Sequence, residues 1–224
     1  MAMLSNLDLI RRVNLFARLT PSQAELLAGS VVKKRFKRGE LIVAQGQTSE
    51  ALFIILTGRV RVVMADDHGG EVILATLRAG DYIGEMSLID NAPHSASVKC
   101  EAISDVLILG RDEFGQCLSE NFALAQAVMR GLVQRLRSAD QKIGSLALMG
   151  VYSRVANVML EYALPDEEGH LMIREKISRQ DIAKMVGASR EMVSRVMKDL
   201  ESQGFLQTLE NGQVQVHERR LTER

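Results

Sequence analysis

The chain has few of the residues that a metal centre or a membrane span requires. Its two cysteines, Cys100 and Cys117, show neither the CxxC spacing of a zinc site nor the four thiolates of an iron–sulfur cluster, so no metal site is expected. No apolar run approaches the roughly 20 residues that span a bilayer, so no membrane partner is expected either. The 28 basic residues balance 28 acidic ones, so any surface for nucleic acid must be local.

The length of 224 residues suits two small domains, each with a core of its own. The N-terminal segment MAMLSNLDLIRRVNLF is amphipathic and lacks the unbroken apolar core and the small-residue cleavage site of a secretory signal. We therefore expect a cytoplasmic protein.

Residues 1–30 are predicted to form short helices, because apolar residues recur at helical spacing and Thr20 and Pro21 suit the cap and first turn of a second helix. From residue 31 to residue 115 the pattern changes. Short runs such as ELIVA, ALFIIL, RVRVVMAD and EVILATL alternate with glycine-bearing breaks. Short strands at this spacing predict an all-β sandwich or barrel.

Residues 116–148 return to a helical pattern, with apolar residues at intervals of three and four that come close to a heptad repeat. Two interpretations are open: an amphipathic helix that lies on its own domain, or a dimerisation helix that pairs with a second copy of the chain. The predicted dimer seam consists of Leu124, Val128, Leu132, Leu136 and Ile143.

The segment GEMSLIDNAPHSAS, residues 84–97, is a loop rich in small residues that follows a strand-like run. Its backbone amides and serine hydroxyls suit a phosphate cradle, although His94 stands where an arginine would serve best. A different hypothesis makes Glu85 and His94 an acid–base pair of an enzyme. Because no orienting group, metal set or nucleophile motif completes such a site, we expect no catalytic residue.

The segment RQDIAKMVGASREMVSRVMKDL, residues 179–200, carries the most specific pattern. Ile182 and Val193 are expected to bury two helices, Gly187 to form the tight turn between them, and Ser189 to cap the second helix. These positions predict a helix-turn-helix. The segment GFLQTLENGQVQVH then predicts a hairpin around Asn211-Gly212, which makes residues 150–224 a winged helix.

In a winged helix the second helix enters the major groove of DNA, and its early residues meet base edges. Arginine can donate two hydrogen bonds to guanine, and glutamate can accept one from cytosine. The alternative is a solvated helix face with a weak Glu191–Arg195 pair. The predicted base-reading residues are Arg190, Glu191, Ser194 and Arg195, and the predicted contacts to the DNA backbone are Ser178, Ser189 and Lys198.

The order of these parts, with GEMSLIDNAPHSAS and ISRQDIAKMVGASREMVSRVMKDLESQGFL, resembles the family of the cyclic AMP receptor protein and the fumarate–nitrate regulator. The resemblance covers nearly the whole chain. It implies an α+β fold with an N-terminal cyclic-nucleotide-binding β-roll (jelly roll), a long dimerisation helix and a C-terminal winged helix-turn-helix. It also implies a homodimeric transcription factor whose partners are double-stranded DNA with a palindromic operator and RNA polymerase.

The resemblance extends to the base-reading positions. Arg190, Glu191 and Arg195 match those of the cyclic AMP receptor type, which implies TGTGA-like half-sites. Ser194 departs from the glycine common there, and together with Glu191 and Arg195 it is also similar to the reader set of the fumarate–nitrate regulator. The half-site therefore stays open. The cysteine cluster of that regulator is absent.

The resemblance also implies a ligand pocket in which Glu85 binds a ribose and His94 replaces the arginine that pairs with a cyclic phosphate. Loss of a charge-assisted hydrogen bond worth about 1.5 to 3 kcal/mol weakens binding roughly 10- to 100-fold. Ala139 and Asp140 replace hydroxyl residues that contact adenine. The effector thus stays open between cyclic AMP, another cyclic nucleotide, a cyclic dinucleotide such as cyclic di-GMP, and none. The implied pocket residues are Gly84, Glu85, Met86, Ser87, His94, Ser95, Ala96, Ala139 and Asp140.

Overall fold

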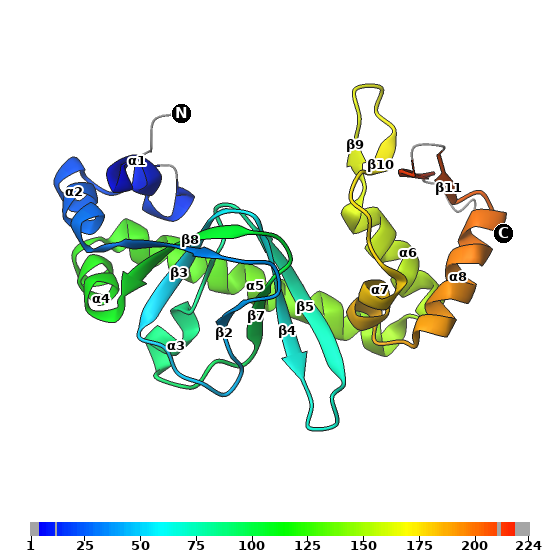
Figure 1. Ribbon diagram of the computed structural model, residues 1–224, viewed down its shortest axis with the longest axis horizontal. Coiled ribbons are helices and arrows are strands. Elements are labelled where there is room, and N and C mark those ends of the chain that lie inside the picture. Colours follow the sequence, from blue (N-terminus) through cyan, green and yellow to red (C-terminus); the bar gives the residue numbers. More distant parts are fainter. Residues whose placement is uncertain (1–4, 12, 210–211, 218–224) are drawn as a thin grey trace. The chain divides into compact units, whose positions relative to one another are not determined.

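The computed structural model describes residues 5–11, 13–209 and 212–217 (Figure 1). The chain divides into two compact units, Met1–Leu136 and Arg137–Arg224. Each unit has an apolar core of its own. No helix in the described ranges is both long and apolar enough to cross a bilayer.

The first unit begins with helices α1 (Asn6–Arg11) and α2 (Pro21–Ser30), separated by the short 3-10 helix η1 (Asn14–Phe16). Thr20 caps α2 as predicted. The amide of Gln23 donates to the Thr20 hydroxyl oxygen at 3.3 Å, and the amide of Thr20 donates to the Gln23 side chain at 3.0 Å. This reciprocal capping box fixes the start of the helix.

Two four-stranded antiparallel sheets follow, with strand orders β1-β8-β3-β6 and β2-β7-β4-β5. Along β3, Phe53 and Ile55 belong to the core that the two sheets share, whereas Leu52 and Ile54 pack in the core that includes the helices. The strand is thus buried on both faces, because successive side chains alternate. The strands are β1 (Val32–Phe36), β2 (Leu41–Val43), β3 (Ala51–Thr57), β4 (Arg59–Ala65), β5 (Glu71–Arg78), β6 (Tyr82–Ile83), β7 (Ser97–Cys100) and β8 (Ser104–Gly110).

The turn between β3 and β4 requires glycine at position 58. Gly58 has φ 93°, and a Cβ there would lie 2.6 Å from the carbonyl oxygen of Ile103 and 2.8 Å from the Cα of Ser104. Both contacts involve backbone atoms, which cannot move aside as a flexible side chain can. The turn therefore combines a left-handed conformation with a close approach of two chain segments.

We expect Gly58→Ala to destabilise the first unit markedly. The positive φ costs about 1 to 2 kcal/mol for a residue with a Cβ, and overpacking adds about 1 to 3 kcal/mol. Urea unfolding measures the loss. Gly80→Ala is the matched control, because Gly80 has φ 96° but a Cβ there would meet no described atom within 4 Å. Equal losses for the two variants would contradict the steric argument.

A buried carboxylate on β8 makes the first unit sensitive to acid. Asp105 accepts from Arg35 Nε at 2.7 Å and lies 3.0 Å from Lys33 Nζ. The hydrogen bond from Arg35, supported by Lys33, lowers the pKa of Asp105 from 3.8 to about 2.

Because this pKa is lower in the folded chain than in the unfolded chain, the ion pairs stabilise the fold above about pH 4. We expect that contribution to disappear as the pH falls from about 4 towards 2. Urea titrations across this range should show a steeper loss of stability for the wild type than for Asp105→Asn. Parallel curves for the two proteins would contradict the assignment.

The long helix begins later than predicted. Residues 116–120 belong to α4 (Arg111–Glu120), and α5 runs from Phe122 to Leu148. Asn121 separates the two helices because its side-chain oxygen accepts the amide of Leu124 at 3.0 Å and so caps α5. The predicted start at residue 116 was therefore too early.

The predicted seam also needs a correction at its N-terminal end. Leu124 and Val128 are each 2% exposed and pack in the core of the first unit, with Leu132 against them. Leu136 and Ile143, by contrast, are 63% and 65% exposed. The first turns of α5 therefore lie on their own unit, and only the later predicted positions leave apolar side chains uncovered.

The second unit is a helix-turn-helix with a small sheet of order β11-β12-β10-β9. Ile182 and Val193 are buried as predicted, and Gly187 takes φ 61° in the turn. β11 pairs with β12 in the predicted hairpin; Asn211 and residues 218–224 lie outside the described residues. Together with the β-roll, this confirms the predicted α+β fold. The elements are α6 (Val151–Tyr162), β9 (Leu164–Pro165), β10 (Leu171–Ile173), α7 (Arg179–Val186), α8 (Arg190–Ser202), β11 (Leu206–Thr208) and β12 (Val214–Val216).

Candidate functional site

Serine caps fix where α7 and α8 begin. The hydroxyl oxygen of Ser178 accepts the amide of Asp181 at 3.1 Å, and that of Ser189 accepts the amide of Met192 at 3.1 Å. Each hydroxyl keeps its own hydrogen for an outside acceptor. The caps are therefore compatible with the predicted contacts of Ser178 and Ser189 to DNA phosphates.

Helix α8 divides into a buried face and an exposed face. Val193, Val196, Met197 and Leu200 are buried in the core of the second unit. The opposite face carries most of the polar side chains predicted to meet DNA: Arg190, Glu191, Arg195 and Lys198 are exposed, and Ser194 is half-buried.

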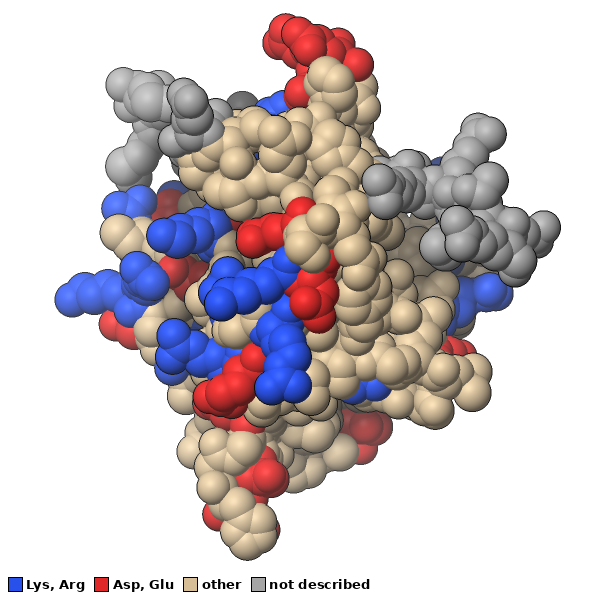
Figure 2. Space-filling model, turned by 90° about the vertical axis from the view of Figure 1, so that its right-hand side faces the viewer, with Lys and Arg blue, Asp and Glu red and all other residues tan. Residues whose placement is uncertain are grey.

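The charge on this side of the molecule is mixed. Figure 2 shows Lys and Arg side chains gathered on one part of the face that it presents, with Asp and Glu between them. A local gathering of basic side chains among acidic ones is compatible with the zero net charge of the whole chain. The polar face of α8 is thus a candidate surface for major-groove contacts.

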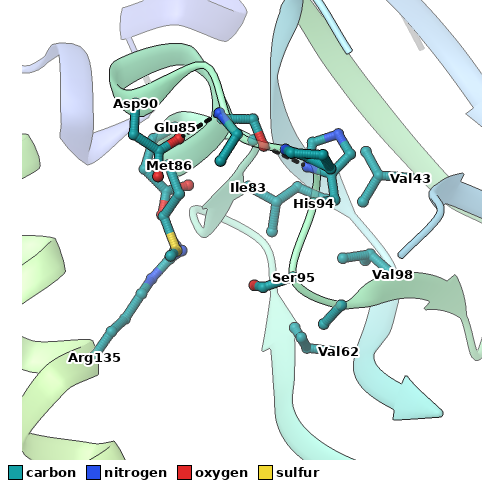
Figure 3. A pocket seen from close by; sticks show the side chains of 15 residues that line it. Val43, Val62, Ile83, Glu85, Met86, Asp90, His94, Ser95, Val98 and Arg135 are labelled. Carbon is teal, nitrogen blue, oxygen red and sulfur yellow. Dashed lines mark hydrogen bonds and ion pairs between the residues drawn. The ribbon is translucent and has the colours of Figure 1, made fainter. Parts of the chain in front are cut away.

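The first unit contains a cavity of about 200 Å³ (Figure 3). Every pocket residue implied between positions 84 and 96 lines it. Ala139 and Asp140 belong to the second unit, and their role stays a prediction. The lining residues are Val43, Val62, Ile83, Gly84, Glu85, Met86, Ser87, Asp90, Ala92, Pro93, His94, Ser95, Ala96, Val98 and Arg135.

Glu85 is the buried acid of the cavity, at 1% exposure. Arg135 on α5, which sequence reasoning missed, donates from Nη1 to Glu85 Oε1 at 2.5 Å and from Nη2 to the carbonyl oxygen of Tyr82. Its guanidinium also lies 5.0 Å from the centre of the Tyr82 ring, in a cation–π contact. Burial raises the pKa of Glu85, and Arg135 opposes that shift.

The second oxygen of Glu85, Oε2, has no hydrogen-bond partner among the described residues, although it is buried. An unsatisfied buried carboxylate oxygen is costly, and it indicates an acceptor for a donor that a ligand supplies. A hydroxyl group of a ligand in the cavity would satisfy it.

The helix that carries Glu85 is held at both ends. α3 (Glu85–Asp90) starts after Gly84, where φ is 94° and a Cβ would lie 2.6 Å from the carbonyl oxygen of Ala51. At its other end Arg111, also missed by sequence reasoning, donates to the carbonyl oxygens of Ser87 and Leu88 at 3.2 and 3.0 Å. A cation at a helix C-terminus is favourable, so Arg111 stabilises this wall of the cavity.

His94 is 8% exposed and both its ring nitrogens are engaged. Nε2 lies 2.8 Å from the hydroxyl of Ser49, and Nδ1 lies 3.0 Å from the hydroxyl of Ser87. Burial lowers the pKa of His94, so the ring is neutral at pH 7. The ring therefore supplies no fixed positive charge to the cavity.

Glu85 and His94 do not form the acid–base pair of the enzyme hypothesis. Glu85 bonds to Arg135, whereas His94 bonds to two serines. Within the described residues no group of His, Cys, Asp and Glu side chains is arranged to hold a metal ion, and Cys100 and Cys117 are buried free thiols.

The sequence matches known regulators over most of its length. It is 33% identical over 180 residues to the cAMP-activated global transcriptional regulator Vfr of Pseudomonas aeruginosa, covering 78% of this chain and 84% of that protein. It is 34% identical over 168 residues to the cAMP-activated global transcriptional regulator CRP of Salmonella typhimurium, covering 74% and 80%. The chain belongs to the CRP/FNR family of transcription regulators.

Family models agree with the two units. A cyclic nucleotide-binding domain matches residues 33–121, and a Crp-like helix-turn-helix domain matches residues 153–221. The fold is similar to that of the c-di-GMP responsive global regulator CLP of Xanthomonas campestris, with a TM-score of 0.75 and 22% identity over 89% of this chain and 100% of that one. This CRP/FNR protein is thus a DNA-binding transcription regulator with a domain of the cyclic nucleotide-binding type, and not an enzyme.

Proposed function

We propose that this CRP/FNR regulator acts as a homodimer that binds a palindromic operator in double-stranded DNA and contacts RNA polymerase. The observation that carries the proposal is the polar face of α8, which leaves Arg190, Glu191 and Arg195 exposed above a fully buried apolar face. Arginine pairs with guanine and glutamate with the amine of cytosine. This set suits half-sites that contain G·C pairs, such as TGTGA.

The uncovered apolar side chains of α5 support the homodimer. Met129, Val133, Leu136 and Ile143 are 49 to 65% exposed, at successive intervals of four, three and seven residues. A stripe with this spacing is a coiled-coil seam, and a second copy of the same helix is its simplest partner. The seam proposed here therefore keeps Leu136 and Ile143, omits Leu124, Val128 and Leu132, which pack in or against the core of the first unit, and adds Met129 and Val133.

The cavity supports a ligand-responsive first unit. The Oε2 atom of Glu85 has no partner among the described residues and can accept a hydrogen bond from a ribose hydroxyl. We therefore infer an effector of the cyclic nucleotide class. The neutral His94 supplies less attraction for a phosphate than an arginine would, which predicts weak cyclic AMP binding at neutral pH. Two of the relatives are named as cAMP-activated regulators, and CLP is named as c-di-GMP responsive.

Selection of binding sites from random DNA by the full-length protein tests the proposed function. We expect a two-fold symmetric consensus whose half-sites lie about one helical turn apart, and two protein chains per operator in sedimentation. A consensus without symmetry would overturn the dimer proposal.

A further inference from the structure

His94, Ser49 and Ser87 form a hydrogen-bonded group at the wall of the cavity. The ring lies between two hydroxyls from distant parts of the chain, at 2.8 and 3.0 Å. Ser87 belongs to α3, so its hydrogen bond joins the ring of His94, labelled in Figure 3, to that helix. The backbone of His94 is fixed as well, because its amide donates to Gln47 and its carbonyl oxygen accepts from Gly46.

The group can hold the imidazole in either protonation state. A neutral ring has one N–H, so it donates to one serine and accepts from the other. A protonated ring has two N–H groups and donates to both serines. Each hydroxyl then has its hydrogen free for another acceptor, and for Ser87, which lines the cavity, that acceptor can be a ligand oxygen.

The charged groups described around His94 provide little positive charge to balance a bound anion. Among the described residues, Arg135 is the only Lys or Arg that lines the cavity, and it is committed to Glu85. Glu50, next to Ser49 in the chain, pairs with Arg111. Asp90 is exposed on α3 and adds a negative charge. A bound phosphate would therefore bring an uncompensated negative charge beside the ring.

We propose that the cavity selects ligands by charge: it binds a singly charged cyclic phosphate only together with one proton, which His94 takes up from solvent. An uncharged ligand binds without proton uptake. The inference rests on the proposed function of the cavity as a nucleotide site. Because the bound anion favours the charged ring, binding of the cyclic phosphate strengthens as the pH falls.

Calorimetry on the full-length protein tests this inference, with cyclic AMP and with adenosine as the uncharged control. Titrations at pH 6, 7 and 8, each in two buffers of different ionisation enthalpy, count the protons taken up. We expect the affinity for cyclic AMP to rise at least tenfold from pH 8 to pH 6, with close to one proton taken up at pH 8. Adenosine should show neither effect.

Two variants separate the charge at position 94 from the hydrogen bond that Ser49 makes with the ring. His94→Arg should bind cyclic AMP independently of pH and about 10- to 100-fold more tightly than the wild type at pH 8. Ser49→Ala removes one acceptor for the charged ring. The rise in affinity for cyclic AMP should therefore occur at lower pH in this variant than in the wild type.

Wild-type binding that does not change with pH, or no binding at pH 6, would overturn the proton coupling. If His94→Arg binds cyclic AMP in that case, the cavity remains a nucleotide site and only the coupling fails. If His94→Arg also fails to bind, the proposed effector class fails too. Gel shifts with operator DNA test the DNA-binding function separately.

Discussion

Replacing Leu136 with Asp is expected to convert the protein from a dimer to a monomer and to lower its affinity for a symmetric operator at least about 100-fold. Leu136 lies in the middle of the proposed seam and is 63% exposed in the single chain. In a dimer the substitution would place two carboxylates against apolar side chains and against each other. A monomer contacts one half-site only. It therefore loses the gain in effective concentration that a dimer obtains by linking two half-site contacts.

Sedimentation velocity and gel shifts measure this change. Gln134→Asp is the matched control, because Gln134 is exposed on the same helix but lies outside the seam spacing. It adds the same charge without entering the contact. A Leu136→Asp protein that stays dimeric would place the dimer interface elsewhere.

Arg190→Ala and Arg195→Ala should each cost about 1 to 3 kcal/mol of specific binding per half-site and relax base preference at one position. Both side chains are exposed on α8, so their removal leaves the core of the second unit intact. Affinities for operators with single base changes measure the loss. Because the wild-type arginine discriminates at its contacted base pair, the variant should bind the changed and unchanged operators equally.

Lys198→Ala is the comparison for these two variants. A lysine that contacts only phosphate should weaken binding to all sequences alike and reduce the salt dependence of binding. If the arginine variants behaved in the same way as Lys198→Ala, the base-reading assignment would fail.

The sequence predicted the second unit well because the residues that determine the helix-turn-helix act over short distances along the chain. Ile182, Gly187 and Ser189 act within one turn of their own helices, and each has the burial, dihedral angle or cap expected of it. The seam of α5 was less predictable. This helix carries two apolar stripes, and spacing alone does not say which stripe packs on its own unit, so Leu124 and Val128 were misplaced.

The cavity was predicted only in part for a related reason. Glu85 and His94 stand in one short segment, and both line the cavity. Their partners come from elsewhere: Arg135 is 50 residues from Glu85, and Ser49 is 45 residues from His94. No spacing in the sequence indicates such contacts, because they depend on how the sheets and α5 pack.

The fixed backbone around His94 has a consequence for the evolution of this regulator. Its bonds to Gln47 and Gly46 involve main-chain atoms only, so they persist whichever side chain stands at position 94. Histidine and arginine codons differ by a single base. Natural selection can therefore exchange a titrating side chain for a permanently charged one in one mutational step while the loop keeps its shape.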